Sequence, residues 1–404
     1  MKYSHISVAV PMLAELENLP ALLEMLNRQT FRDFTFYCCV NNPDEWSCSG
    51  NEEQRRMYAD NQATLDRLLS FQSLNPDSKI VILDFSSPGR GWKGRKRGVG
   101  WARKELFAAI AHDCADNELV VSLDADTEIS ETYLESVLCT MNAHPDHSAL
   151  CVPYYHPLSG SEKQDRAMLR YEIYMRHYLL NLLESDNPYA FTALGSAMVF
   201  PLWAYRRVGG ITPLQGGEDF YLMQKFAKTG QVLLSCNEIV RPQGRRSSRV
   251  PFGTGPAIAK GLDSMDSTYP LYPAEGFRSV AKTFALFARL YDEDVETPMS
   301  DFLRQQLKTD ELWQPLRKNF KTRDLFVHAC QERVDGLRIL QFLKTFDVRP
   351  AEEEIALFCS DRHIPLPEGF IFSTSPINTV DCLRNSLFER EMMLRLRHDE
   401  NASL

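Results

Sequence analysis

Two carboxylates follow an apolar run in the segment Ser122-Leu-Asp-Ala-Asp-Thr-Glu128. Asp124 and Asp126 come directly after residues 119–123, which the pattern predicts to be a buried strand. Paired carboxylates at such a place are costly to dehydrate without a cation. Mg²⁺ and Mn²⁺ take carboxylate oxygens and keep positions open for phosphate oxygens. Asp also favours turns, so a plain turn is the alternative, but the context after an apolar strand favours a divalent-metal site.

A second acidic pair, Glu218-Asp219, opens an apolar helical pattern that ends at Gly230. A helix N-terminus stabilises acidic side chains, and capping alone accounts for one of the two. Gly216 and Gly217 precede the pair, and glycine lets another group approach the backbone closely. The pair is therefore a candidate for chemistry beyond helix capping.

Two basic segments stand out in a chain whose net charge is −9. Residues 89–104 hold seven basic residues and several glycines and run into a helix, which suits phosphate. Residues 241–249 hold four arginines, which could clamp phosphate oxygens in bidentate fashion. A solvated basic face and a mobile surface loop are the respective alternatives. The acidic total charge argues against nonspecific nucleic-acid binding, so any bound anion needs a local patch.

Strand and helix patterns alternate along the first part of the chain. Strands are predicted at 6–10, 34–40, 79–85 and 119–123, and helices at 16–26, 63–69 and 99–114. This alternation predicts an α/β fold with a mostly parallel sheet and helices on both faces. The segments that follow the strands hold Pro11, Asn41, residues 88–97 and Asp124. Ligands bind at the carboxyl ends of such strands, so we expect these residues on one rim.

The length of 404 residues predicts two domains. We expect an α/β domain over residues 1–270 and a mostly helical region over 271–404, where helical periodicity recurs. No apolar stretch approaches the ~20 residues of a membrane span, which leaves peripheral membrane contact open. The ten cysteines form no CxxC pair, and the first residues run straight into a strand without a signal peptide. We therefore expect reduced thiols and a cytoplasmic location.

Taken together, these motifs resemble family 2 glycosyltransferases of the GT-A fold. The resemblance covers residues 4–260 and rests on five motifs in the family's order. These are the opening Ser7-Val-Ala-Val-Pro-Met-Leu-Ala-Glu-Leu-Glu-Asn18, Ala102-Arg103 after Arg97, Leu123-Asp-Ala-Asp126, the strand and turn over 193–210, and Glu218-Asp219. Lys104 and Ala14 stand where the family usually has Asn.

The resemblance implies a nucleotide-diphosphate sugar as donor and a hydroxyl acceptor on a glycan, lipid or small molecule. It implies Mn²⁺ or Mg²⁺ on Asp126 with help from Asp124, and Asp219, next to Glu218, as the base of an inverting reaction. The donor contacts that it implies are Pro11, Glu15, Asn41, Arg97, Asp124, Arg245 and Arg249.

Two departures from the family leave details open. Asn41 replaces the family's usual Asp, so the nucleobase is not indicated. The chain has no His between His177 and His328 to serve as a further metal ligand. Either Asp126 and the diphosphate hold the metal without it, or arginines replace part of its charge.

Two other functions compete with sugar transfer. A nucleotidyltransferase would share the sheet and the metal, but it would want a Gly-rich phosphate loop after the first strand, and residues 11–18 contain no glycine. A non-catalytic nucleotide-sugar-binding or scaffold protein would bind metal and donor without transfer or hydrolysis.

Overall fold

The computed structural model describes residues 2–94, 96–234, 236–245, 253–264 and 269–402, and the chain forms two compact units. The first unit contains Met1–Gln164 and Ala193–Ala259, and the second contains Asp165–Thr192 and Lys260–Leu404. The chain thus leaves the first unit, builds one helix of the second, and returns. The structure places the change of unit near 260 rather than 270. Residues 165–192 belong to the second unit, where Arg176 and Glu172 of this stretch lie within ion-pair distance of Glu391 and Arg384 near the C-terminus.

A mixed seven-stranded sheet forms the centre of the first unit, in the order β3-β2-β1-β4-β7-β6-β8. The strands are β1 (Ile6–Met12), β2 (Phe34–Asn41), β3 (Ile80–Phe85), β4 (Leu119–Ser122), β6 (Ala149–Cys151), β7 (Met198–Pro201) and β8 (Val232–Leu233). The first four are parallel, and β7 runs antiparallel to both of its neighbours. Both β1 and β4 are buried along their whole length, which explains why Ser7 and Ser122 are their only polar residues.

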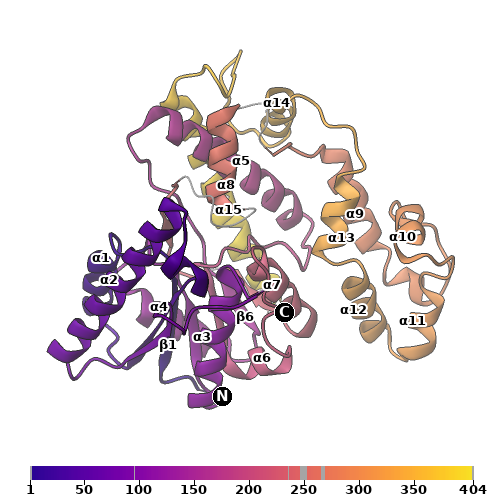
Figure 1. Ribbon diagram of the computed structural model, residues 1–404. Coiled ribbons are helices and arrows are strands. Elements are labelled where there is room, and N and C mark those ends of the chain that lie inside the picture. Colours follow the sequence, from indigo (N-terminus) through magenta and orange to yellow (C-terminus); the bar gives the residue numbers. More distant parts are fainter. Residues whose placement is uncertain (1, 95, 235, 246–252, 265–268, 403–404) are drawn as a thin grey trace. The chain divides into compact units, whose positions relative to one another are not determined.

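Helices cover both faces of this sheet, which confirms the predicted fold class. The helices are α1 (Leu19–Asn27), η1 (Asp44–Cys48), α2 (Glu52–Leu74), α3 (Val99–Asp113), α4 (Tyr133–Ala143), α6 (Leu202–Arg207) and α7 (Glu218–Thr229). Because crossovers are right-handed and the strand order reverses after β3, α1 and α2 lie on the face opposite α3. On the α3 face, the Phe107 ring lies 5.1 Å from Phe200 of β7, which lies 5.1 Å from Phe226 of α7. Figure 1 shows α3, α6 and α7 close together.

A short two-stranded ribbon lies beyond the end of β4. Residues of β5 (Thr127–Glu128) pair antiparallel with β9 (Arg241–Pro242). The Gln243 amide also donates to the Asp126 carbonyl at 3.3 Å. The ribbon therefore holds the start of the Arg-rich segment beside the Asp-Ala-Asp turn, although the two are far apart in sequence.

All regular secondary structure in the described residues of the second unit is helical. Its elements are α5 (Glu162–Leu183), α8 (Thr254–Asp263), α9 (Ala274–Ala285), η3 (Arg289–Tyr291), α10 (Ser300–Leu307), α11 (Gln314–Asn319), α12 (Arg323–Arg333), α13 (Gly336–Leu343), α14 (Ala351–Asp361) and α15 (Ile377–Ala402), where α5 and α8 begin in the first unit. None of the helices in the described ranges is long and apolar enough to cross a membrane.

Candidate active site

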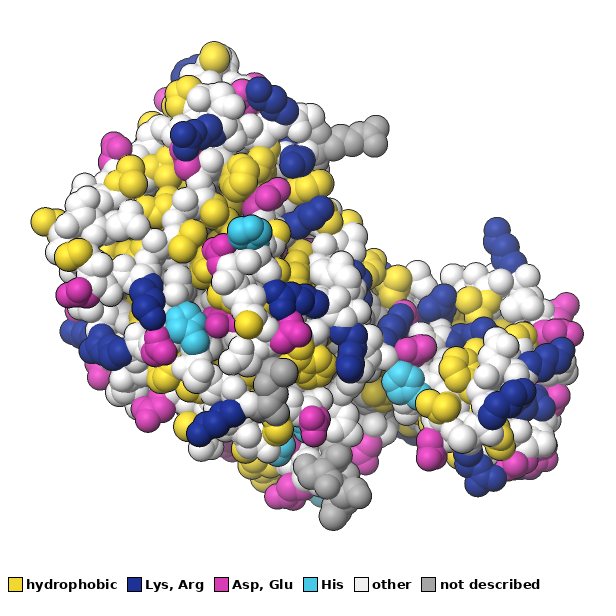
Figure 2. Space-filling view, turned by 90° about the horizontal axis from the view of Figure 1, so that it is seen from below, with side chains coloured by type: hydrophobic (Ala, Val, Ile, Leu, Met, Phe, Trp, Pro, Cys, Tyr) yellow, Lys and Arg dark blue, Asp and Glu magenta, His cyan; other side chains and the backbone are white. Residues whose placement is uncertain are grey.

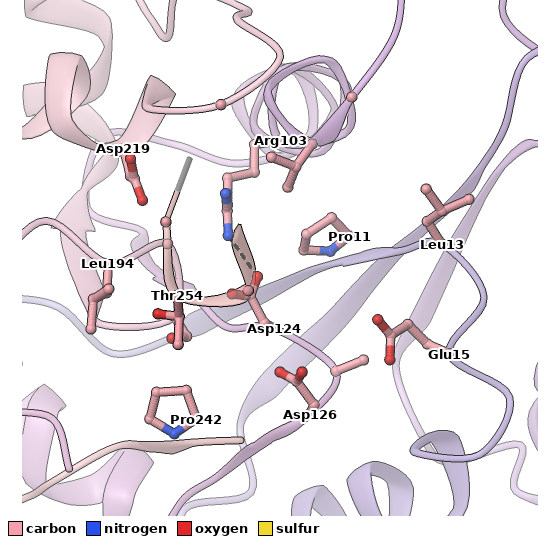
Figure 3. A pocket seen from close by; sticks show the side chains of 18 of the residues that line it. Pro11, Leu13, Glu15, Arg103, Asp124, Asp126, Leu194, Asp219, Pro242 and Thr254 are labelled. Carbon is pink, nitrogen blue, oxygen red and sulfur yellow. Dashed lines mark hydrogen bonds and ion pairs between the residues drawn. The ribbon is translucent and has the colours of Figure 1, made fainter. Parts of the chain in front are cut away.

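An open pocket of about 240 Å³ lies at the carboxyl ends of the central strands. Eight of the residues expected at a site line it, namely Pro11, Glu15, Asn41, Asp124, Asp126, Glu218, Asp219 and Arg245. Their side chains come from five separate segments that parallel strand ends and the β5–β9 ribbon bring to one rim. Figure 3 shows Asp124 and Asp126 on one side of this pocket and Asp219 on another.

The Asp-Ala-Asp turn is fixed by backbone hydrogen bonds at both ends. The Leu123 amide donates to the Ala9 carbonyl at 3.0 Å, which extends the β1–β4 ladder by one residue. The Thr127 amide donates to the Asp124 carbonyl at 3.1 Å and closes the turn. The carboxylates of Asp124 and Asp126 are 37% and 14% exposed, so a cation can reach both from the pocket.

Each of these aspartates pairs with a different arginine. Arg245 Nε lies 2.7 Å from the Asp126 carboxylate, and its Nη2 donates to Glu15. Arg103 Nη2 donates to the Asp124 carboxylate at 2.6 Å, and its Nη1 donates to Glu218. Within the described residues, these two arginines thus offset part of the negative charge of the five carboxyl groups that line the pocket.

Asp219 lies in the first turn of α7, after Gly217, whose φ of +77° suits glycine. Its carboxylate accepts a hydrogen bond from the Phe220 amide at 2.7 Å. Burial raises the pKa of Asp219 to about 7, and the nearby Glu218 charge adds to this, while Arg103 and the Phe220 amide oppose it. We expected the helix N-terminus alone to keep this carboxylate ionised, but desolvation outweighs that effect. A carboxyl group that titrates near neutrality suits a general base.

Asn41 closes the pocket at the end of β2. Its amide Nδ2 donates to the Met12 carbonyl at 2.9 Å and to the Cys39 carbonyl at 3.3 Å. The Asn41 backbone carbonyl accepts from Asn61 Nδ2 at 3.0 Å. Because the amide donors face protein carbonyls, the oxygen Oδ1 remains as an acceptor at the pocket wall.

The basic segment over 89–104 reaches the pocket at the N-terminus of α3, where Gly98 and Val99 line it. A Cβ on Gly100 would lie 2.2 Å from the Leu214 carbonyl, and one on Gly98 would lie 3.0 Å from Gln215. Both glycines therefore allow the loop before α7 to approach the backbone closely. Arg97 is 50% exposed, pairs with Glu45 at 2.6 Å, and does not line the pocket.

Other basic residues of this segment also contact carboxylates. These pairs are Arg90 with Asp84, Lys93 with Asp44 and Lys96 with Glu105. Figure 2 shows the same intermingling of both signs over the face in view. The expected contact of Arg249 lies outside the described residues.

The donor set suits a hard divalent cation that a substrate also ligates. Asp124 and Asp126 offer carboxylate oxygens, and Mg²⁺ typically combines one or two such groups with phosphate oxygens and water. Within the described residues, no group of three or more His, Cys, Asp or Glu side chains could hold a metal. A divalent cation on Asp124 and Asp126 would take further ligands from a diphosphate and water.

No family model and no curated protein matches this chain. Several solved structures of glycosyltransferases are similar to it. S. aureus TarS 1–349 in complex with UDP-GlcNAc has a TM-score of 0.41 and 13% identity, over 99% of this chain and 92% of that one. The mannosyltransferase PcManGT from Pyrobaculum calidifontis in complex with GDP-Man and Mn²⁺ has a TM-score of 0.40 and 12% identity, over 97% and 86%. A further S. aureus TarS structure has a TM-score of 0.38 and 13% identity, over 83% and 55%.

These neighbours belong to the class that the sequence motifs resemble.

Proposed function

We propose that this chain is a metal-dependent glycosyltransferase that moves a sugar from a nucleotide-diphosphate sugar to a hydroxyl acceptor with inversion. One observation carries the proposal. A single pocket holds the metal-suited pair Asp124 and Asp126 together with Asp219, a half-buried carboxyl group whose pKa is raised to about 7. A site that only bound the donor would need Asp124 and Asp126, but it would not need a carboxyl group that can accept a proton near neutral pH.

The pocket residues divide the reaction between its two ends. Asp219 accepts the proton of the acceptor hydroxyl, and that oxygen forms a bond to the anomeric carbon. The bond from this carbon to the phosphate oxygen breaks, and its electron pair leaves with the nucleoside diphosphate. A divalent cation on Asp124 and Asp126 would neutralise charge on that leaving group. Arg245 lies beside Asp126 and can add charge-assisted hydrogen bonds to phosphate oxygens.

Asn41, which lines the pocket at the end of β2, contributes to the choice of nucleobase in the donor. Its neutral acceptor oxygen takes the place of the carboxylate that the family's members usually present to the nucleobase. A base with an N–H group on its pairing edge, such as uracil or guanine, would satisfy that oxygen. The acceptor class stays open between a glycan, a lipid and a small molecule.

The decisive experiment follows hydrolysis of a panel of nucleotide-diphosphate sugars with Mn²⁺ or Mg²⁺, since water can replace the unknown acceptor. We expect metal-dependent turnover of at least one donor. Asp219→Asn should bind that donor nearly as wild type does but lose ~100-fold or more in turnover, the usual scale for loss of a general base. Asp301→Asn, at an exposed carboxylate of the second unit, is the matched control.

The outcomes separate enzyme from binding module. Donor binding without any hydrolysis in wild type would favour a nucleotide-sugar-binding protein. Full turnover in Asp219→Asn would show that another residue acts as the base, and Glu218 would be the first candidate. Asp126→Ala should lose most metal-dependent donor binding while remaining folded, and EDTA-insensitive wild-type affinity in that variant would contradict the metal site.

A further inference from the structure

Arg103 is a buried cation that joins two sides of the pocket. It projects from α3, and its side chain is 4% exposed. One end of the guanidinium donates to Asp124 at 2.6 Å, and the other end donates to Glu218 at the start of α7. Figure 3 shows Arg103 reaching from its helix toward Asp124. One side chain thus contacts both the end of β4 and the helix that carries Asp219.

The backbone around this guanidinium leaves it little freedom to move. A Cβ on Gly195 would lie 1.8 Å from Arg103 Nη2, so any larger residue there would displace the guanidinium. The Gly195 carbonyl in turn accepts a hydrogen bond from Ser122 Oγ at 2.6 Å. Gly195 is therefore tied to β4 and forms a wall against which the planar guanidinium lies. A planar, forked donor fixes direction in a way that a single ammonium cannot.

Burial and hydrogen bonding distinguish Glu218 from its neighbour Asp219. Glu218 is 1% exposed, and an unpaired buried carboxylate is strongly unfavourable. Its Oε1 receives the Arg103 hydrogen bond, which leaves Oε2 without a partner. Asp219 receives no hydrogen bond from Arg103 in the described structure and keeps its carboxylate at the pocket wall. Glu218 is thus held in place, whereas Asp219 is available to a ligand.

We propose that Arg103 is a positioning residue that locks the first turn of α7, through Glu218, to Asp124 at the end of β4. This role rests on the proposed function, because it fixes where Asp219 stands relative to the donor. The lock assigns Glu218 to anchoring and leaves Asp219 as the base. Arg103 also lines the pocket, and both ends of its guanidinium are committed to Asp124 and Glu218.

Two variants test the lock directly. Arg103→Lys keeps the charge but loses the fork, and Arg103→Met removes both. In Arg103→Lys we expect the amides of residues 219–222 to exchange hydrogen at least ~10-fold faster than in wild type, while exchange in β1 is unchanged. This readout needs no activity. Equal exchange in the first turn of α7 would overturn the proposal whatever the enzyme does.

Kinetics then separate positioning from simple charge balance. We expect Arg103→Lys to lose about 10- to 100-fold in kcat for donor hydrolysis, with KM changed less than about 3-fold, the pattern of an interaction needed for the reaction step. Arg206→Lys, in an exposed ion pair with Asp116, is the control and should match wild type. A wild-type kcat in Arg103→Lys would reject the positioning role while leaving the proposed function intact.

A double variant covers the case in which Arg103→Met folds poorly. Arg103→Met with Glu218→Gln removes the uncompensated carboxylate, so melting temperature should recover while kcat stays low. Recovery of both would mean that Arg103 only balances charge and would overturn the proposal. If wild type hydrolyses no donor, the proposed function fails, and hydrogen exchange alone decides whether the lock exists.

Discussion

Arg245 lies where a cation would have to approach Asp126. Its Nε lies 2.7 Å from that carboxylate, and its Nη2 contacts Glu15. We expect Arg245→Ala to bind Mn²⁺ about 3- to 5-fold more tightly in the absence of nucleotide. The reason is that a half-buried ion pair contributes up to about 1 kcal/mol, which the metal must otherwise displace.

The same variant should bind the nucleotide sugar more weakly, since a phosphate-binding arginine is gone. Calorimetry with Mn²⁺ alone and with the donor in excess Mn²⁺ measures the two effects separately. Arg206→Ala is the control. Unchanged affinity for Mn²⁺ alone would show that Arg245 does not compete with the metal.

The titration of Asp219 gives a second prediction at this scale. Its pKa is raised to about 7, mainly by burial, and a base works only when ionised. Donor turnover should therefore be full above this pKa and fall about tenfold per pH unit below it. A profile of kcat against pH measures this, and a flat profile down to pH 5 would contradict the role.

The raised pKa of Asp219 also makes the stability of the folded chain depend on pH. Because the folded-state pKa exceeds that of the unfolded chain, the ionised form of Asp219 opposes folding. The contribution of Asp219 to stability should thus fall as pH rises from about 4 to 7. Asp219→Asn should melt higher than wild type above pH 7, with the difference shrinking toward pH 4, as thermal unfolding at several pH values would show.

The sequence predicts the positions of the acidic pocket residues, but it does not indicate which arginines lie beside them. Asp124 follows an apolar strand pattern and Asp219 opens an apolar helical pattern, and both boundaries can be read from the sequence, so their positions could be predicted. Arg97 stands in a conspicuous basic segment, yet exposed carboxylates neutralise it. The motif Ala102-Arg103 contains this arginine but indicates no role for it. A signal existed, because it shares the buried face of α3 with Leu106 and Phe107, where an unpaired charge would be costly.

At the scale of elements, His177 of α5 makes the second unit sensitive to acid. Its ring is fully buried, and neither ring nitrogen has a hydrogen-bond partner. Burial lowers the pKa of His177 to about 3, helped by Arg362 and Arg170. The carboxylate of Glu354 lies 4.0 Å away, but it contacts Arg349 at 3.1 Å and the Ala274 amide at 3.2 Å.

The unfolded chain takes up this proton near pH 6.5, whereas the folded chain does not. His177 therefore contributes stability at neutral pH that is lost as pH falls through 6.5, about 2 kcal/mol between pH 7 and 5. His177→Phe fits among Phe277 and Phe358 and should reduce this loss. Chemical denaturation of both proteins at pH 7 and pH 5 measures it. An equal loss in the variant would assign the acid sensitivity to other groups.

Element boundaries were predictable where apolar periodicity was unbroken. The strands expected at 34–40 and 79–85 differ by one residue at one end from β2 and β3. Within the region expected to be mostly helical over 271–404, α12 and α13 are separate helices, and Asp335 caps the second through the Arg338 amide. Helix α5 was missed. Its buried face carries Glu172 and Arg176, which look like surface residues unless their partners in α15 are known.

At the scale of the whole molecule, the second unit is built from two separated stretches of chain. In α5, Arg176 pairs with Glu391 and Glu172 lies 3.4 Å from Arg384, and all four side chains are at most 1% exposed. A fragment of residues 1–270 keeps α5 but loses α15. Removing one partner of a buried pair costs about 3–5 kcal/mol, and α5 would also expose its apolar face.

We therefore expect the fragment 1–270 to be aggregation-prone, with protease cleavage concentrated in residues 165–192. A chain that ends at Arg397 keeps Arg384 and Glu391 and should resist protease as the full chain does. Limited proteolysis read by mass spectrometry compares all three proteins. A fragment 1–270 that melts as the full chain does and protects residues 165–192 would show that α5 is stable without its C-terminal partners. The physical reason to expect otherwise is that desolvated charges cannot be left unpaired, so the middle of the chain depends on its last helix.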